Sequence, residues 1–182
     1  MSERKNGAGL EDMPTRRQAV TGMAIVFGGL AAAYRLWGGT QQSMIEAQST
    51  GAEALRTYLH QEVEFKASPQ RIYEVLLDSR QFAAFSGEPA QIHREAGGAF
   101  SMFGGKIVGR NVELVPGRRI VQAWRPASWD SGVYSIVKFE LKEQGSQAKV
   151  ILDHAGFPEG SFRSLDSGWH VRYWEPLKRF LA

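Results

Sequence analysis

The sequence predicts an α+β domain in which a curved antiparallel sheet of about seven strands surrounds one long C-terminal helix. Short segments of alternating apolar and polar residues follow one another, and their connections are too short for the crossovers of a parallel sheet. Residues 162–182 are typical of an amphipathic helix, and this helix is the only expected element long enough to cover the apolar face of the sheet. The apolar residues of this segment share one helical face: Trp169, Tyr173, Leu177 and Phe180.

The expected elements begin with an entry strand at 63–65. Ser68 and Pro69 are typical of a helix N-cap and of the first helical residue, and Asp78 caps a second short helix that ends at Gly87. Pro176 predicts a kink or a local irregularity in the terminal helix, because proline lacks the N–H that a helix interior needs. The remaining strands are expected at residues 90–95, 99–103, 106–115, 118–125, 133–142 and 147–154.

A glycine-rich segment at 97–109 reads GGAFSMFGGKIVG and raises the question of a phosphate-binding loop. Phe100 stands where such a loop needs its first glycine, and Ile107 stands where it needs a hydroxyl to bind Mg²⁺. We therefore interpret Gly104 and Gly105 as a two-residue hairpin turn between two strands, because glycine readily takes the positive φ that such turns require.

Composition and spacing exclude several classes of function. The 22 Lys and Arg residues nearly balance the 19 Asp and Glu residues, and no basic run with interleaved aromatics predicts a nucleic-acid partner. The absence of cysteine excludes disulfides, thiol catalysis and cysteine-ligated zinc. His60, His93 and His170 lack the spacing of metal ligands, so we expect neither a metal nor a cofactor.

The N-terminal segment 1–33 resembles a twin-arginine signal peptide. A polar stretch carries Arg16 and Arg17, a mildly apolar stretch rich in Gly and Ala follows, and Ala31-Ala32-Ala33 offers a cleavage site. The apolar stretch is short for a membrane span of about 20 residues. We expect export to the periplasm or anchoring at the membrane by this segment, with a cytoplasmic location as the alternative.

The segment 34–61 is expected to be a connector, with a short helix that carries Ala52, Leu55 and Leu59. The compact domain is then expected at 62–182. Alternation turns Val137, Phe139 and Leu141 to one face of the sheet, and it places His154 inward beside Val150 and Leu152. Two interpretations of His154 stay open: a ligand contact or base, and a hydrogen-bonded histidine of the core.

Many large aromatics in one domain predict either a ligand cavity or ordinary filling of the core under the helix. Trp174 lies about a hundred degrees from Tyr173 on the helical wheel, so we expect it to be partly exposed. The loop around Ser128 and Trp129 carries no nucleophile motif. The candidate cavity residues are Phe103, Trp124, Phe139, His154, Trp169 and Tyr173.

Specific motifs across residues 60–182 point to one family. These are Phe100-Ser101-Met102-Phe103, Gly109, LVPGRRIV at 114–121, Trp124-Arg125, Ser128-Trp129 and Gly168-Trp169 with Tyr173. On these residues the chain resembles the activator-of-heat-shock-protein-90-ATPase homologue family, within the START-like or SRPBCC superfamily. The resemblance implies a helix-grip fold, often with a hydrophobic cavity.

The resemblance also implies a co-chaperone-like role, in which the domain binds the chaperone and stimulates its ATP hydrolysis. We therefore expect a non-enzymatic binding protein that engages a chaperone or another protein. A carrier or sensor of a small hydrophobic ligand is the alternative, and an enzyme of the cyclase or hydrolase type ranks last because no paired polar constellation emerges.

Overall fold

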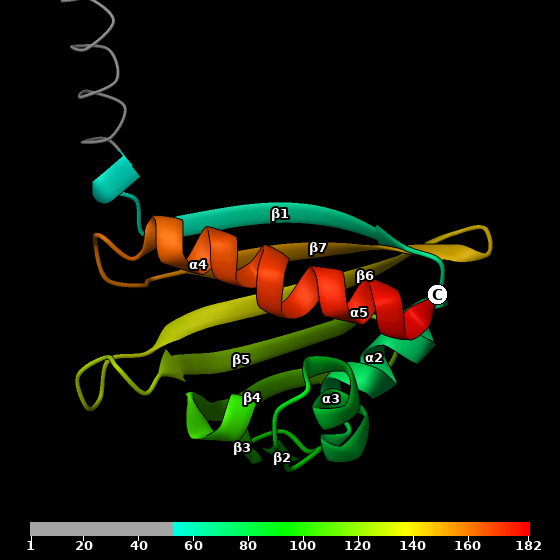
Figure 1. The fold of residues 1–182 in the computed structure, drawn as a ribbon, viewed down its shortest axis with the longest axis horizontal. Helices are drawn as coiled ribbons and strands as arrows, with labels where there is room; N and C mark the ends of the chain where they lie inside the picture. The colour runs from blue at the N-terminus through cyan, green and yellow to red at the C-terminus, as the bar shows by residue number, and fades with distance from the viewer. Residues whose placement is uncertain (1–52) are drawn as a thin grey trace, which may run out of the picture. The chain divides into compact units, whose positions relative to one another are not determined.

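The computed structural model describes residues 53–182. The segment 1–33, with its twin-arginine pattern, and most of the connector 34–61 lie outside the described residues. Seven strands form one antiparallel sheet in the order β1-β7-β6-β5-β4-β3-β2, and a long helix from the C-terminal end crosses it (Figure 1). The α+β helix-grip prediction is confirmed.

The strands of this sheet differ from the predicted ones mainly at their ends. The sheet begins at Tyr58 rather than at residue 63, and Leu59 is a buried strand residue that shares no helix with the exposed Leu55. Of the predicted strand at 90–95 only Gln91–Ile92 pairs. The strands are β1 (Tyr58–Phe65), β2 (Gln91–Ile92), β3 (Ala99–Met102), β4 (Ile107–Val115), β5 (Arg119–Pro126), β6 (Ser135–Gln144) and β7 (Gln147–Ala155).

Two short helices, α2 (Pro69–Leu77) and α3 (Ser79–Ser86), connect β1 to β2. The predicted caps are in place. The Ser68 hydroxyl accepts the backbone N–H of the third helical residue at 3.2 Å, and the Asp78 carboxylate accepts two backbone N–H groups of α3 at 3.1 and 2.9 Å. Each cap satisfies N–H groups that have no partner within the helix.

The turn between β3 and β4 is longer than the predicted two-residue hairpin. Phe103, Gly104 and Gly105 form a 3₁₀ turn, in which all three residues have positive φ, of 53°, 64° and 91°. Phe103 leaves the strand because its ring packs 5.1 Å from the ring of Tyr173 and 5.2 Å from that of Phe82. Aromatic packing thus offsets the strain of a positive φ at a residue other than glycine.

The C-terminal segment is one continuous helix, called here the terminal helix, made of α4 (Phe162–Gly168), a π-helical segment (Trp169–Trp174) and α5 (Glu175–Leu181). The predicted irregularity at Pro176 is confirmed as this π-helical segment, where the N–H of Glu175 bonds to the carbonyl of His170 five residues back. The wider turn reduces the angle between successive side chains.

Trp174 is therefore not partly exposed, as the regular helical wheel predicted, but only 2% exposed. It faces the sheet together with Tyr173, and its indole N–H donates to Oε1 of Gln61 on β1 at 2.5 Å. The Gln61 side chain also donates to Oδ1 of Asp166 at 2.7 Å. These bonds attach the terminal helix to the edge strand of the sheet.

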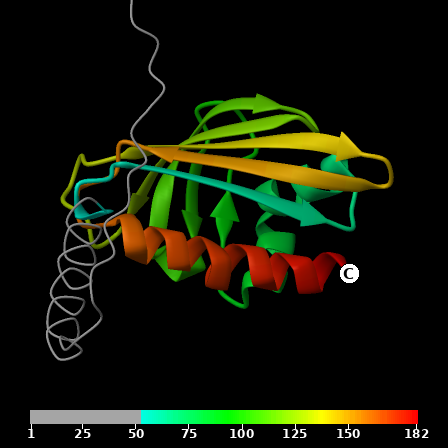
Figure 2. The same cartoon turned by 90° about the horizontal axis from the view of Figure 1, so that it is seen from above.

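The terminal helix lies along one face of the sheet, as Figure 2 shows from above. The hydrophobic core fills the space between them. Val137, Phe139 and Leu141 are buried on that face as predicted, and so are Leu152 and His154 on β7. Residues of β1 alternate regularly between exposed and buried. The opposite face of the sheet consequently carries exposed polar side chains.

Candidate functional site

A cavity of about 280 Å³ opens between the terminal helix and the β4–β5 side of the sheet. Its wall comes from the β3–β4 turn, from β5 with the loop after it, and from one face of the terminal helix. The lining residues are Phe103, Lys106, Ile107, Trp124, Pro126, Ser128, Trp129, Ser164, Leu165, Gly168, Trp169, Arg172 and Tyr173.

The structure brings four of the six predicted cavity residues together around this space: Phe103, Trp124, Trp169 and Tyr173. The other two do not line it. The Phe139 and His154 rings pack 5.6 and 5.8 Å from the ring of Trp169. The prediction that Phe139 and His154 line the cavity is therefore wrong. Both belong to the core, because the large Trp169 indole packs against their rings and separates them from the cavity.

The cavity has flat aromatic walls. The rings of Trp124 and Trp169 stack at 5.7 Å with 27° between their planes, and Trp129 meets Trp124 edge to face at 6.4 Å. The ring of Tyr173 lies 4.3 Å from that of Trp169. Apolar walls of this kind, with a few polar groups among them, are typical of sites for small hydrophobic or planar molecules.

His154 is a hydrogen-bonded histidine of the core. The Trp169 indole can only donate, so Nδ1 of His154 accepts its N–H at 3.2 Å. The other ring nitrogen, Nε2, lies 2.7 Å from the Ser135 hydroxyl, and that hydroxyl donates to the carbonyl of Trp124 at 3.0 Å. His154 must then carry its proton on Nε2 and donate it to Ser135.

This arrangement keeps His154 neutral. Burial lowers its pKa from 6.5 to about 3, because a charged imidazole would lose its hydration there. Burial also raises the pKa of Tyr173, which the nearby Trp124 indole offsets only in part. With both nitrogens of His154 engaged, neither is available to take a proton from a molecule in the cavity.

Two polar groups of the cavity wall lack strong partners. The buried Nε1 of Trp124 makes no hydrogen bond of normal geometry within residues 53–182. The Tyr173 hydroxyl donates only to the sulfur of Met102, at 3.9 Å. A buried donor without a partner is costly, so an acceptor atom of a bound molecule would be stabilised beside these groups.

The rim of the cavity is cationic. Lys106 and Arg172 both line it and both are largely exposed. They share one carboxylate, because Glu88 lies 2.5 Å from Nζ of Lys106 and 3.7 Å from Nη1 of Arg172. The lining residues include no Asp or Glu. The rim thus carries two positive charges against one negative charge.

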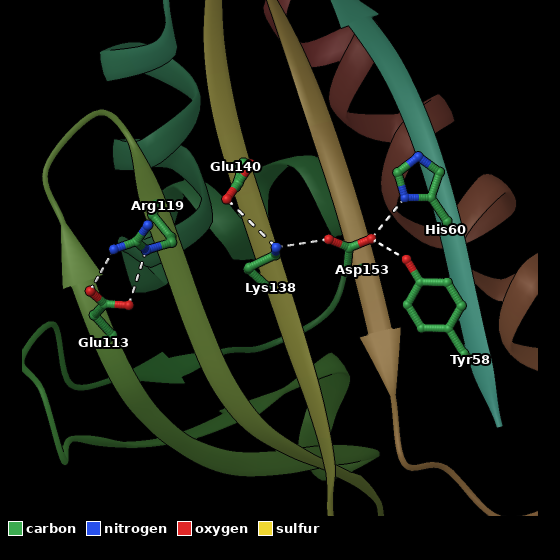
Figure 3. Close-up of polar contacts among 7 residues, drawn as sticks. All are labelled: Tyr58, His60, Glu113, Arg119, Lys138, Glu140 and Asp153. Carbon is green, nitrogen blue, oxygen red and sulfur yellow. Dashed lines mark hydrogen bonds and ion pairs between the residues drawn. The ribbon is translucent and has the colours of Figure 1, made fainter. Parts of the chain in front are cut away.

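A polar cluster lies on the outer face of the sheet (Figure 3), and none of its residues lines the cavity. Asp153 on β7 accepts hydrogen bonds from Tyr58 at 2.6 Å and His60 at 2.7 Å on β1, and it pairs with Lys138 on β6 at 2.9 Å. Partial burial raises the pKa of Asp153, but these three donors outweigh it and lower the pKa from 3.8 to about 2.

This outer cluster was not predicted from the sequence. Asp153 pairs directly with His60 in the β1–β7 register and with Lys138 in the β6–β7 register. The polar alternation of each strand was visible, but the register that brings the three together was not. As predicted, Asp153 and its neighbour His154 point to opposite faces and cannot form an acid–base pair.

Residues 53–182 offer neither a metal cluster nor a helix that could cross a membrane. No three His, Asp or Glu side chains there gather closely enough to hold a metal ion. In the same part of the chain, none of the helices combines the length and the apolar character that a bilayer crossing requires.

Comparison with known proteins agrees with this geometry. The family described as "Activator of Hsp90 ATPase homolog 1-like protein" matches residues 66–182, which is more than half of the chain. The chain belongs to this family. Residues 66–182 form its AHSA1-like domain.

Relatives of the AHSA1-like domain include named activators. The chain is 36% identical over 116 residues to an activator of 90 kDa heat shock protein ATPase homolog from Dictyostelium discoideum, and 26% identical over 137 residues to homolog 1 from Homo sapiens. The matches cover 63% and 75% of this chain but only 30% and 40% of those relatives. This chain therefore corresponds to well under half the length of the curated relatives.

Solved structures share the fold of the AHSA1-like domain. The crystal structure of an HSP90 activator from Plasmodium falciparum superposes with a TM-score of 0.60 at 23% sequence identity, covering 64% of this chain and 89% of that chain. At this level of identity the likeness concerns the fold.

Proposed function

We propose that the AHSA1-like domain is a non-enzymatic binding protein and that its protein partner is a chaperone of the Hsp90 type. Membership of the family, with a match over residues 66–182, is the observation that supports this role. A non-enzymatic role is supported by the hydrogen bonds of His154, since both of its ring nitrogens are engaged within the core and neither is free to act as a base.

The match covers only 30% to 40% of the Dictyostelium and human activators, so we expect binding with little stimulation of ATP turnover. The test titrates a purified Hsp90 chaperone with the full chain and follows both heat of binding and ATP hydrolysis. Saturable binding supports the proposal. The absence of any binding would contradict it, and a robust saturable rise in ATP turnover would show that this domain alone activates the chaperone.

The cavity favours a second candidate function, the carriage or sensing of a small hydrophobic ligand. The observation that supports it is the open space beside Gly168. This residue lines the cavity inside the terminal helix with helical backbone angles, and a Cβ added there would meet no atom within 4 Å. Glycine in a helix costs about 0.5–1 kcal/mol relative to alanine. The chain thus keeps open space beside its aromatic walls at some expense in helix stability.

A neutral planar probe tests this second function. We expect 2-naphthylmethanol to bind the full chain with one site in calorimetric titration. The Cβ of a larger residue at position 168 meets no atom within 4 Å, so Gly168→Leu should occupy the space and remove this binding while leaving the unfolding transition intact. Equal binding by the wild type and Gly168→Leu would place the probe elsewhere. No binding by either would reject the cavity as a ligand site.

A further inference from the structure

We propose that the cavity selects a flat aromatic acid of one or two rings, whose anionic group binds Lys106 and Arg172 at the rim and whose ring lies between the aromatic walls. This inference rests on the second function proposed above, and it adds the charge and size class of the ligand. It follows from three properties of the cavity: its volume, its rim and its unpaired donors.

The volume limits the size of the ligand. A cavity of about 280 Å³ is roughly twice the 150 Å³ that suffices to take up one benzene molecule. One ring with a short substituent, or two fused rings, fits this space. A long lipid chain does not. The stacked Trp124 and Trp169 rings and the edge of Trp129 favour a flat body over a branched one.

The rim decides the charge of the ligand. Lys106 and Arg172 come from different elements, the β3–β4 connection and the terminal helix, and both approach the same Glu88 carboxylate. The Arg172 contact, at 3.7 Å, is longer than a hydrogen bond, so its N–H groups stay available to a further acceptor. A carboxylate on the ligand would complete the neutralisation of the two cations.

The wall residues also carry two buried donors that lack strong partners. Nε1 of Trp124 makes no hydrogen bond of normal geometry among the described residues, although it lies close to the Tyr173 hydroxyl. That hydroxyl in turn donates only to the sulfur of Met102. A ring oxygen or nitrogen on the ligand could accept a bond from these groups. Such a bond would fix the orientation of the ring while the rim holds the anion.

The experiment compares 2-naphthoate with the neutral 2-naphthylmethanol, using the full chain and calorimetric titration at low salt. We expect 2-naphthoate to bind roughly twofold to fivefold more tightly, which corresponds to the upper range for ion pairs near a surface. This advantage should shrink as salt is raised, because salt screens exposed charges.

Two variants should change the affinity for 2-naphthoate in opposite directions, and a third serves as their control. Arg172→Gln should weaken 2-naphthoate binding by roughly threefold, and Glu88→Gln should strengthen it by a similar factor because it frees both cations. The matched control is Arg179→Gln, another exposed cation of the terminal helix that does not line the cavity. Arg179→Gln should change the affinity for neither ligand. The binding of 2-naphthylmethanol should be unaffected by all three substitutions.

The outcomes separate this inference from the proposed function. If both probes bind with equal affinity, and neither Arg172→Gln nor Glu88→Gln changes the ratio of the two affinities, the charge selection is wrong while the cavity remains a ligand site. If neither probe binds, both the selection and the ligand function are wrong. A change of the same sign in Arg172→Gln and Glu88→Gln would also overturn the inference, because that result indicates a structural effect on the rim.

Discussion

Trp169 donates its indole N–H to Nδ1 of His154 across 3.2 Å, and this bond joins the terminal helix to β7. The same indole forms part of the cavity wall. One residue therefore both anchors the helix on the sheet and shapes the space beside it. The bond also requires an unprotonated Nδ1, so the protonation of His154 and the attachment of the helix are linked.

The first prediction concerns pH. The pKa of His154 falls from 6.5 in the unfolded chain to about 3 in the folded protein, so the unfolded state binds the proton more tightly. The free energy of unfolding should have its full value above pH 6.5. It should decrease as the pH falls, by about 1.4 kcal/mol per pH unit between pH 6 and pH 4. Chemical denaturation across this range measures the slope.

The variant His154→Gln should remove most of this slope, whatever it does to the stability at pH 7. His170→Gln is the matched control, because His170 is an exposed residue of the same terminal helix. It should leave the slope in place. A slope that persists in His154→Gln would show that other groups cause the acid sensitivity.

The second prediction compares how much two tryptophans of the cavity wall contribute to the stability of the fold. Trp169 is 2% exposed and contacts Trp124, Phe139 and Tyr173, so Trp169→Ala should cost about 3–5 kcal/mol of the free energy of unfolding. Trp129→Ala serves as the comparison, since Trp129 lines the cavity but is only partly buried. Its cost should be about 1 kcal/mol. A loss below about 1 kcal/mol for Trp169→Ala would mean that this indole has few packing partners.

Much of the fold follows from local patterns. The alternation of Val137, Phe139 and Leu141 identified the buried face, and Ser68 with Asp78 identified two helix starts. These signals depend on neighbours in sequence, where periodicity and capping chemistry apply directly. The long terminal helix was predictable for the same reason.

The site was predictable only in part, because its geometry depends on long-range contacts. Phe103, Trp124, Trp169 and Tyr173 were recognised as large aromatics suited to a cavity, whereas the π-helical segment that buries Trp174 leaves no clear periodic signal. The shared contact of Lys106 and Arg172 with Glu88 joins residues up to 84 positions apart and was not foreseen. Such contacts depend on register and helix placement.

The third prediction concerns the outer cluster of Figure 3. The pKa of Asp153 is lowered from 3.8 to about 2 in the folded protein, so its carboxylate stabilises the fold above pH 4 and this contribution is lost as the pH falls toward 2. Asp153→Asn should cost about 2 kcal/mol at pH 7. The control Glu113→Gln removes the exposed pair with Arg119 and should cost much less. If both variants lose the same free energy of unfolding in chemical denaturation, the cluster around Asp153 stabilises the fold no more than an exposed ion pair does.

The fourth prediction concerns location. We propose that the protein is exported by the twin-arginine route, because Arg16 and Arg17 precede a weakly apolar stretch and a small-residue cleavage site. Replacing both arginines with lysine should block export of a reporter fused after residue 40. The control replaces Arg4 and Lys5, which lie outside the pair, and should leave export unchanged. Continued export without Arg16 and Arg17 would rule out this route.

The last prediction returns to Gly168, where stability and binding should move in opposite directions. A Cβ at this position meets no atom within 4 Å, and the backbone already has helical angles. Gly168→Ala should therefore stabilise the protein by about 0.5–1 kcal/mol, because alanine loses less conformational freedom in a helix than glycine. The same methyl group projects into the space beside Trp169 and should weaken 2-naphthylmethanol binding. A chain that gains stability but loses binding indicates that the open space serves function rather than folding. If Gly168→Ala instead destabilises the protein in chemical denaturation, the space beside this helix is already filled and the cavity is not a ligand site.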